Sequence, residues 1–311
     1  MATAVVYETS PAAGSYVNSW RPWMALYGLR LRPATPVASH QVLQAPIQKL
    51  LPEEMMLTIL GKLPTAQLAV AQCVCLQWRA LADTPDLWRA ACGEAFRGHS
   101  DPKTDARLVR VQHRGSWKAM FLDRPHLRFD GLYVSRNTYL RTGIVEWRVK
   151  NPVHLVCYFR YYRFYPDGHL LYRTSPEVVS KVARSMTDAP RKLKSDDALT
   201  WGRYRLEGIK LSTAMIYPNS ASTEIRSRLK LRSTVRGANN RLDVDSIVSY
   251  DRGDGSVVPV DAHGDDDDVE DPSRLRSHQR GKSPFVFVPW ERIAESPLNL
   301  PVSKMDFYVP G

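Results

Sequence analysis

The stretch LPEEMMLTILGKLP, residues 51–64, decides how the first part of this chain folds. Its first proline suits the start of a helix, and the two glutamates that follow suit the positive end of the helix dipole. Because Pro64 cannot continue a helix, the stretch predicts one short helix that ends there. Its apolar residues recur at helical spacing, at Met55, Met56, Ile59, Leu60 and Leu63.

Two more helical patterns follow. In the first, Thr65 is a suitable N-cap, and apolar residues from Leu68 to Ala82 surround the helix almost completely as far as Gln72. The second begins at Thr84-Pro85 and aligns Leu87, Trp88, Ala91, Cys92 and Phe96 on one stripe. Three short helices cannot bury so many apolar side chains by themselves, and large exposed apolar patches mark partner surfaces. The pattern therefore predicts a helical docking module.

The segment after the module is polar and rich in turn-forming residues over 97–113. Ser116–Leu122 predicts one more short helix, which Arg124-Pro125 ends. From Arg128 onward, strand patterns dominate.

Turn chemistry at Tyr165-Pro-Asp-Gly168 joins the aromatic run Leu155–Phe164 to His169–Arg173 and predicts a hairpin. The chain holds seven to nine strand candidates with no long helices between them, which indicates an antiparallel barrel or sandwich. The predicted fold class is therefore α+β. The remaining strand candidates are Arg128–Val134, Trp201–Leu211, Met215–Tyr217, Ile225–Val235, Leu242–Tyr250 and Phe285–Val288.

Ile225–Val235 is the clearest strand, since apolar or small residues alternate with basic ones. A solvated outer face of the barrel is one interpretation of the basic side. The second is a binding face for an acidic or phosphorylated substrate, for which the arginine fork is well suited. The third is nucleic-acid binding with tyrosines from Tyr158 to Tyr165 as stacking partners, which we disfavour because these rings suit a barrel core. The candidate substrate-binding residues are Arg226, Arg228, Lys230 and Arg232.

The helical module resembles the F-box family. About a dozen positions agree in order and spacing, and Leu76 departs, since a basic residue is usual there. The matching residues are Leu51-Pro52, Glu54-Met55, Ile59-Leu60, Leu63-Pro64, Leu68, Val74-Cys75, Trp78-Arg79, Leu81-Ala82 and Leu87-Trp88.

The resemblance implies a substrate-recognition subunit of an SCF-type cullin–RING ubiquitin ligase. Such a subunit is not an enzyme; it binds the Skp-type adaptor through the F-box and, through that adaptor, the cullin and RING subunits. Trp88 and Phe96 are better suited to packing inside the module, and Trp78 is the favoured hot spot. The residues implied to contact the adaptor are Leu51, Pro52, Ile59, Leu63, Pro64, Leu68, Cys75 and Trp78.

Residues from about 50 to 250 also look like the F-box only protein 9 family. Animal members carry a tetratricopeptide region before the F-box, whereas no repeat of about 34 residues precedes it here. The chain is in this respect more similar to short plant members. The segments that carry this likeness are Ser116–Pro125, Arg128–Ser135, Thr138-Tyr139, Tyr161–Gly168 and Gly202–Leu206.

The expected domain organisation follows from these patterns. Residues 1–19 are a disordered lead, and 20–45 an ordered arm or linker that contains the strand-like Met24–Leu31. The domains proper are the F-box at 46–97, a helical linker at 98–126, and a β-rich recognition domain at 127–311 with an acidic loop at 261–281.

The composition limits the alternatives. The net charge of +11 favours acidic partners. Apolar runs are far shorter than the roughly 18 residues of a spanning helix, so we expect no membrane contact. The start MATAVVYETS lacks a signal-peptide pattern, although several arginines and few acids leave a transit peptide open. We expect the cytoplasm and/or nucleus. The four cysteines lack zinc-ligand spacing and are predicted to be small buried side chains, at Cys73, Cys75, Cys92 and Cys157.

Catalytic patterns are missing from the sequence. It has no nucleophile elbow, no phosphate-binding glycine loop and no pair of histidines at metal spacing. Asp265–Asp268 lacks the alternation of a calcium loop and is interpreted as solvated. We expect no cofactor and no metal. The alternative function is a binding module whose barrel holds a small apolar ligand or RNA, with the F-box secondary.

Overall fold

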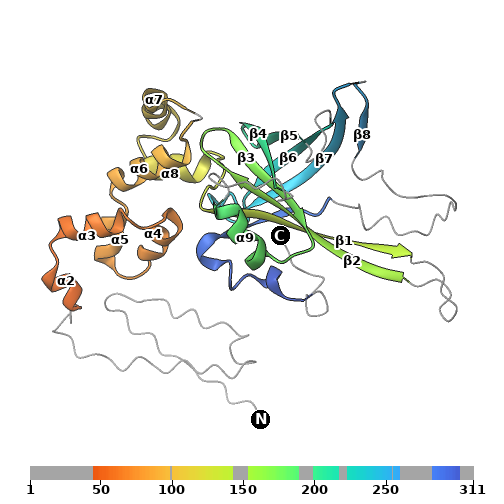
Figure 1. Cartoon of the computed structure of the whole chain (residues 1–311). Helices are drawn as coiled ribbons and strands as arrows, with labels where there is room; N and C mark the ends of the chain where they lie inside the picture. The colour runs from red at the N-terminus through yellow and green to blue at the C-terminus, as the bar shows by residue number, and fades with distance from the viewer. Residues whose placement is uncertain are drawn as a thin grey trace, which may run out of the picture. The chain divides into compact units, whose positions relative to one another are not determined.

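The computed structural model describes residues 45–98, 100–142, 153–188, 199–216, 223–253, 255–259 and 282–301 (Figure 1). The chain divides into two compact units, Met1–Pro52 and Glu53–Gly311. In the first unit the described part is the helix α2, Pro46–Leu50, with the residues beside it. The predicted lead at 1–19, the arm at 20–44 and the acidic loop at 261–281 lie outside the described residues.

The second unit begins with four short helices, α3 (Glu53–Leu60), α4 (Thr65–Ala71), α5 (Leu76–Ala82) and α6 (Pro85–Ala95). The helical patterns are confirmed, and Thr84 caps α6 as predicted. In α3, Met56 and Leu60 are buried, as the spacing of its apolar residues requires.

The prediction of one helix from Leu68 to Ala82 is wrong. Cys75 is extended, with φ −157° and ψ 171°, so the chain leaves the helix and starts again at Leu76. Its thiol accepts a hydrogen bond from the backbone N–H of Trp78 at 3.4 Å and thereby caps α5. Thr65 is also not a cap, because Pro64 holds the cap position of α4 with extended backbone angles.

The linker contains a helix where the sequence indicated turns. The helix α7 spans Pro102–Gln112 and follows Asp101 as N-cap, so the turn prediction for 97–113 is wrong. The pattern was missed because α7 buries only a narrow stripe that includes Asp105 and Val109. The next helix, α8 (Trp117–Asp123), is confirmed, with the Ser116 hydroxyl accepting from the Ala119 N–H at 3.1 Å.

The rest of the unit is a closed antiparallel β-barrel (Figure 1). In the described residues, eight strands follow one another in the order β6-β5-β4-β3-β2-β1-β9-β7, and the pairing of β6 with β7 closes the ring. The strand β8 pairs with β7 in addition. The nine strands are β1 (Gly131–Thr142), β2 (Val153–Phe164), β3 (His169–Ser175), β4 (Leu199–Glu207), β5 (Lys210–Ile216), β6 (Thr223–Arg232), β7 (Arg241–Asp251), β8 (Val257–Pro259) and β9 (Phe285–Pro289).

Several strand boundaries differ from the prediction. The run Trp201–Leu211 is two strands, because a turn at Gly208 with φ +58° separates β4 from β5. The strand predicted to reach Val235 ends at Arg232, where the Asn240 side chain accepts the Thr234 N–H at 3.0 Å and holds the chain in a turn. The hairpin of β2 and β3 is confirmed, with Phe164 paired to Leu170.

Side chains fill the barrel interior. The rings of Tyr162 and Phe164 stack with centroids 5.6 Å apart, and Tyr204, Phe285 and Phe287 belong to the same buried cluster. A second cluster lies outside the barrel wall, where residues of β1, β2 and β3 pack with the helix α9 (Val179–Asp188) and with Leu298 of the short helix η3 (Pro297–Asn299). No helix was predicted for residues 179–188, where α9 lies. Aromatic side chains of β2 therefore enter both cores, since successive residues of a strand point to opposite faces.

Candidate functional site

The short helices α3, α4 and α5 and their connections expose large apolar side chains. Met55 and Ile59 of α3 are one helical turn apart and are 52% and 44% exposed. Val70, Val74 and Leu76 are 67%, 60% and 75% exposed. Exposed apolar residues gathered on a few short helices are typical of a partner-binding surface. We call these five residues the docking surface.

The eight residues expected to contact an adaptor differ in exposure. In the first unit, Leu51 is half-buried and Pro52 is exposed. In the second unit, Ile59 and Pro64 are exposed and Leu63, Cys75 and Trp78 are half-buried, whereas Leu68 is 3% exposed and belongs to the core of the module.

No contact with the adaptor was predicted for Met55, Val70, Val74 or Leu76. Leu76 had a visible signal, because it is the position that departs from the family pattern. Val70 and Val74 also had one, since they lie in the nearly uncharged segment from Leu68 to Leu76. The predicted continuous helix gave no reason to expect that Val70 and Val74 are exposed. The structure shows instead that the helix is broken at Cys75.

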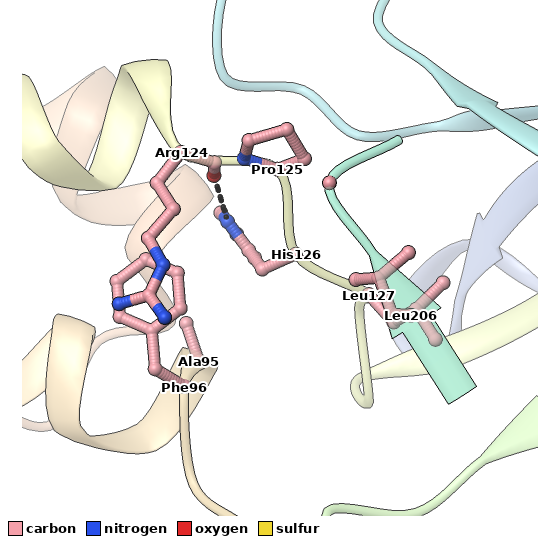
Figure 2. A pocket seen from close by; sticks show the side chains of 8 residues that line it. Ala95, Phe96, Arg124, Pro125, His126, Leu127 and Leu206 are labelled. Atoms are coloured by element: carbon pink, nitrogen blue, oxygen red, sulfur yellow. Dashed lines mark hydrogen bonds between the residues drawn. The ribbon is translucent and has the colours of Figure 1, made fainter. Parts of the chain in front are cut away.

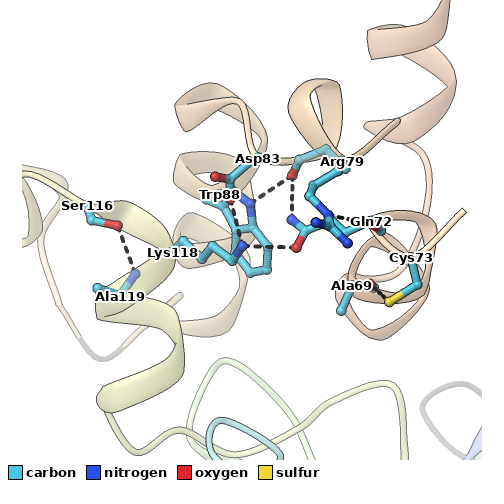
Figure 3. Close-up of polar contacts among 10 residues, drawn as sticks. Ala69, Gln72, Cys73, Arg79, Asp83, Trp88, Ser116, Lys118 and Ala119 are labelled. Carbon is cyan, nitrogen blue, oxygen red and sulfur yellow. Dashed lines mark hydrogen bonds and ion pairs between the residues drawn. The ribbon is translucent and has the colours of Figure 1, made fainter. Parts of the chain in front are cut away.

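Hydrogen bonds that involve Gln72, Arg79 and Trp88 help to hold the module together (Figure 3), and two of them end on the carbonyl of Ala82. Its carbonyl accepts from the Trp88 indole at 2.9 Å and from the Gln72 side chain at 3.1 Å. The Gln72 carbonyl in turn accepts from Arg79 at 3.2 Å. Trp88 and Phe96 are 2% and 3% exposed, which confirms their predicted packing role.

The linker helix α8 is tied to the module through Lys118 (Figure 3). Its ammonium donates to Gln72 Oε1 at 2.9 Å and to Asp83 Oδ1 at 2.7 Å. On the same helix, Phe121 packs edge-on against Trp88 with centroids 5.7 Å apart. The linker therefore packs as part of the module.

The same linker is tied to the barrel. Arg236 donates to both carboxylate oxygens of Asp123, at 2.7 and 2.9 Å. At the end of α6, Gly98 has φ +78°, and a Cβ there would lie 2.0 Å from the carbonyl oxygen of Pro166. Gln67 of α4 also donates to Glu291 at 2.5 Å. Module, linker and barrel thus share contacts at several separate points.

A small pocket lies at this junction, between the end of α6, the segment Arg124–Leu127 and the β4–β5 turn (Figure 2). The Arg124 guanidinium lies 4.3 Å from the centre of the Phe96 ring and donates to buried Asp105 at 2.7 Å. Burial, more than any neighbouring group, lowers the pKa of His126. Its Nδ1 lies 3.0 Å from the Arg124 carbonyl. We interpret the pocket as part of a structural joint.

The predicted basic face of β6 points outward, since the residues between its cations are buried. Three of the four candidate cations form ion pairs with acids of β6 or β7: Arg226 with Glu224 at 3.1 Å, Lys230 with Asp245 at 2.8 Å, and Arg232 with Asp243 at 3.5 Å. The hydrogen bond from Arg226 is the main reason why the pKa of Glu224 is lowered. Arg228 is exposed and forms no ion pair within the described ranges.

The cysteines are free, and their burial is mixed. Cys92 is buried as predicted, and burial raises the pKa of its thiol to about 12. The prediction is wrong for Cys73, which is exposed, with its thiol directed at the Ala69 carbonyl 3.9 Å away (Figure 3). Cys75 and Cys157 are half-buried.

In the part of the chain that the structure describes, no three histidine, cysteine or acidic side chains gather as metal ligands would. The helices of that part are all too short or too polar to cross a bilayer.

Fold and site together define a class: a helical module with exposed apolar residues, joined to a closed β-barrel. Comparison with known proteins identifies both parts. Residues 49–94 match the family described as F-box-like, and residues 106–311, more than half of the chain, match the F-box only protein C-terminal region. The chain therefore belongs to the family of F-box only proteins.

Two fungal proteins are similar over shorter segments. The F-box protein pof7 of Schizosaccharomyces pombe is 31% identical over 130 residues, which are 39% of this chain and 36% of pof7. The F-box protein HRT3 of Saccharomyces cerevisiae is 35% identical over 83 residues, which are 25% of this chain and 24% of HRT3. The chain thus covers about a third or less of either relative.

Proposed function

We propose that this protein is a substrate-recognition subunit of an SCF-type ubiquitin ligase. The docking surface and the residues around it bind a Skp-type adaptor, which connects the chain to cullin and RING subunits. The barrel binds the target protein. The observation that carries this proposal is the set of exposed apolar residues on helices that match the F-box family, from Met55 to Leu76.

The proposed role is positional and involves no bond chemistry in this chain. A substrate held near a charged conjugating enzyme reacts at a raised effective concentration. The contacts at Asp123–Arg236 and Gly98–Pro166 support this role, because they connect the barrel to the linker, which packs against the module. We place the protein in the cytoplasm and/or the nucleus, where it would meet the adaptor.

Co-purification with a Skp-type adaptor tests the proposal. A Trp78→Ala, Leu63→Asp variant should bind at least about tenfold more weakly, since a buried interface anchor contributes about 2 kcal/mol or more. Both side chains are half-buried, so the exposed substitutions Val70→Asp and Val74→Asp provide a second variant that leaves the core intact.

Val111→Asp is the matched control. Val111 is 74% exposed but lies on α7, outside the docking surface, so this change should leave adaptor binding unaltered. Circular dichroism of each variant checks that the barrel is folded. Adaptor binding by the Val70→Asp, Val74→Asp variant that equals the wild type would contradict the proposal.

The alternative of a small apolar ligand inside the barrel gains no support from the interior. Aromatic side chains such as Tyr133, Tyr162 and Phe164 are fully buried there and pack on one another. A ligand-dependent rise in the melting temperature, or salt-dependent RNA binding, would support the alternative of a ligand-binding or RNA-binding module.

A further inference from the structure

The outer face of the barrel places small residues between arginines. In the register of β4, β5 and β6, Ala214 lies between Arg203 and Arg226, and Ser212 lies between Arg205 and Arg228. Neighbouring strands are about 4.8 Å apart, so the two arginine columns are separated by about 10 Å. A strand with short side chains between two such columns leaves room for anionic groups to approach both. We call these four arginines with Ser212 and Ala214 the arginine face.

The acids near the arginine face are paired with groups other than Arg203 and Arg228. Glu224 pairs with both Arg226 and Arg252, and Glu207 pairs with Arg205 at 2.7 Å. Asp243 and Asp245 pair with Arg232 and Lys230, and Asp167 pairs with His169.

Arg203 and Arg228 differ from the other two arginines of the arginine face. Both are exposed, and neither forms an ion pair with any residue that the structure describes. Lys210, which lies opposite Lys230 in the register, is in the same situation. Among the described residues of β4, β5 and β6, the positive charge without an ion pair therefore lies at Arg203, Lys210 and Arg228. Arg203 was not part of the predicted basic face, because it lies on another strand.

Apolar side chains adjoin these cations. Trp201 precedes Arg203 by two residues on β4 and therefore lies on the same face of the sheet. It is 38% exposed, and the ring of Tyr165 supports it with centroids 5.6 Å apart. Ile216, the last residue of β5, is 46% exposed. A large apolar residue, Trp201, thus lies next to Arg203.

We propose that the arginine face, with Trp201 and Ile216, binds an extended anionic peptide segment of a partner protein. A bulky apolar side chain of the peptide packs on Trp201, and its phosphate or carboxylate groups accept paired hydrogen bonds from Arg203 and Arg228. Planar guanidinium groups are suited to both anions. The inference rests on the proposed function only in that the partner would then be the ligase substrate.

Fluorescence anisotropy with labelled synthetic peptides tests the proposal on the full chain. One peptide carries a leucine followed by two phosphoserines at alternate positions; the others replace the phosphoserines by glutamate or serine, or the leucine by glycine. We expect binding of the phosphoserine and glutamate peptides and little binding of the serine peptide. The two anionic peptides distinguish a phosphate-dependent from a merely acidic signal.

Two pairs of variants separate specific contacts from net charge. Arg203→Glu with Arg228→Glu should weaken binding about a hundredfold, since each charge-assisted hydrogen bond contributes about a factor of ten. Arg110→Glu with Arg184→Glu removes the same charge from exposed positions on α7 and α9 and should change binding less than about threefold, as expected for a distant effect screened by salt. Replacing leucine by glycine in the peptide should weaken binding to wild type but not to Trp201→Ala.

The other outcomes contradict the proposal. Equal losses of peptide binding in the two double variants would show that binding depends on net charge alone. Failure of both anionic peptides to bind would also overturn the proposal. If an RNA oligonucleotide bound instead, and the Arg203 and Arg228 changes abolished that binding, the arginine face would be an RNA-binding surface and the proposal would be wrong. Adaptor co-purification is run in parallel: adaptor binding without peptide binding refutes this inference alone, and peptide binding without adaptor binding refutes the ligase role alone.

Discussion

Asn239 and His126 lie 113 residues apart in the chain and pack together at the joint between linker and barrel, with Asn239 Nδ2 3.2 Å from Nδ1 and 3.4 Å from Nε2 of the imidazole. Phe96 and Phe121 flank the same ring, with centroids 5.4 and 4.6 Å away. If Nδ1 donates its proton to the Arg124 carbonyl, Nε2 is left to accept from Asn239. This arrangement suits a neutral imidazole.

Stability should therefore fall in mild acid. The folded-state pKa of His126 is lowered, chiefly by burial, so below about pH 6.5 the unfolded chain takes up a proton that the folded chain does not. The contribution of this group is present above that pH and is lost as the pH falls, by at most about 1.4 kcal/mol per pH unit. Urea unfolding at a series of pH values measures this slope.

His126→Gln should flatten the slope even if it lowers stability at every pH. An unaltered slope in His126→Gln would show that another group carries the acid sensitivity.

Leu68 and Leu76 should respond in opposite ways to substitution. Leu68 is 3% exposed, so Leu68→Ala should cost about 2–5 kcal/mol of unfolding free energy through the cavity that it leaves. Leu76 is 75% exposed, and Leu76→Lys should change stability by less than about 0.5 kcal/mol while weakening adaptor binding. Chemical denaturation and co-purification measure the two effects. A large stability loss in Leu76→Lys would assign this residue to the core instead.

Two glycines near the end of α6 make a matched pair. Gly98→Ala should lower stability by more than about 1 kcal/mol, because φ is +78° and the new Cβ would meet the Pro166 carbonyl at 2.0 Å. Gly93→Ala should raise it by about 0.5–1 kcal/mol, since Gly93 lies within α6 and has no atom within 4 Å of the added Cβ. Thermal unfolding of both variants tests the joint. Equal effects would mean that α6 does not approach the β2–β3 turn.

The ion pairs of the linker should differ in importance. Arg124→Ala leaves Asp105, whose side chain is 8% exposed, hydrogen-bonded to the Ser100 hydroxyl without its ion-pair partner, and should cost about 1.5–3 kcal/mol. Arg236→Ala breaks a pair in which the side chains are 66% and 40% exposed and should cost clearly less than Arg124→Ala. Urea unfolding in low and high salt distinguishes them, because salt screens the exposed pair more strongly.

Local sequence patterns predicted much of this protein. Tyr165–Gly168 predicted the hairpin, the stripe with Trp88 and Phe96 predicted a buried helix face, and the alternation in β6 predicted its outward cations. Each of these depends on neighbours within a few residues, so propensity and period are sufficient.

The wrong predictions arose where local patterns carry too little information. The helix α7 is mostly polar, and the charge of its buried Asp105 is balanced by Arg124, which is 19 residues away. The break at Cys75 lies inside a run that is apolar on almost every side, where periodicity carries no information about a boundary.

The sequence by itself thus determined most of the helices and strands, with α7, α9 and the break at Cys75 as exceptions, and it predicted a helical module rich in apolar residues. Tertiary structure alone decided that the sheet closes into a barrel, since this requires β1 to pair with β9 and β6 with β7. It also decided which cations are free: Arg226 lies beside Glu224, whereas Arg203 and Arg228 face small residues. Such pairings depend on the register between strands that are distant in the chain, and no local pattern contains that register.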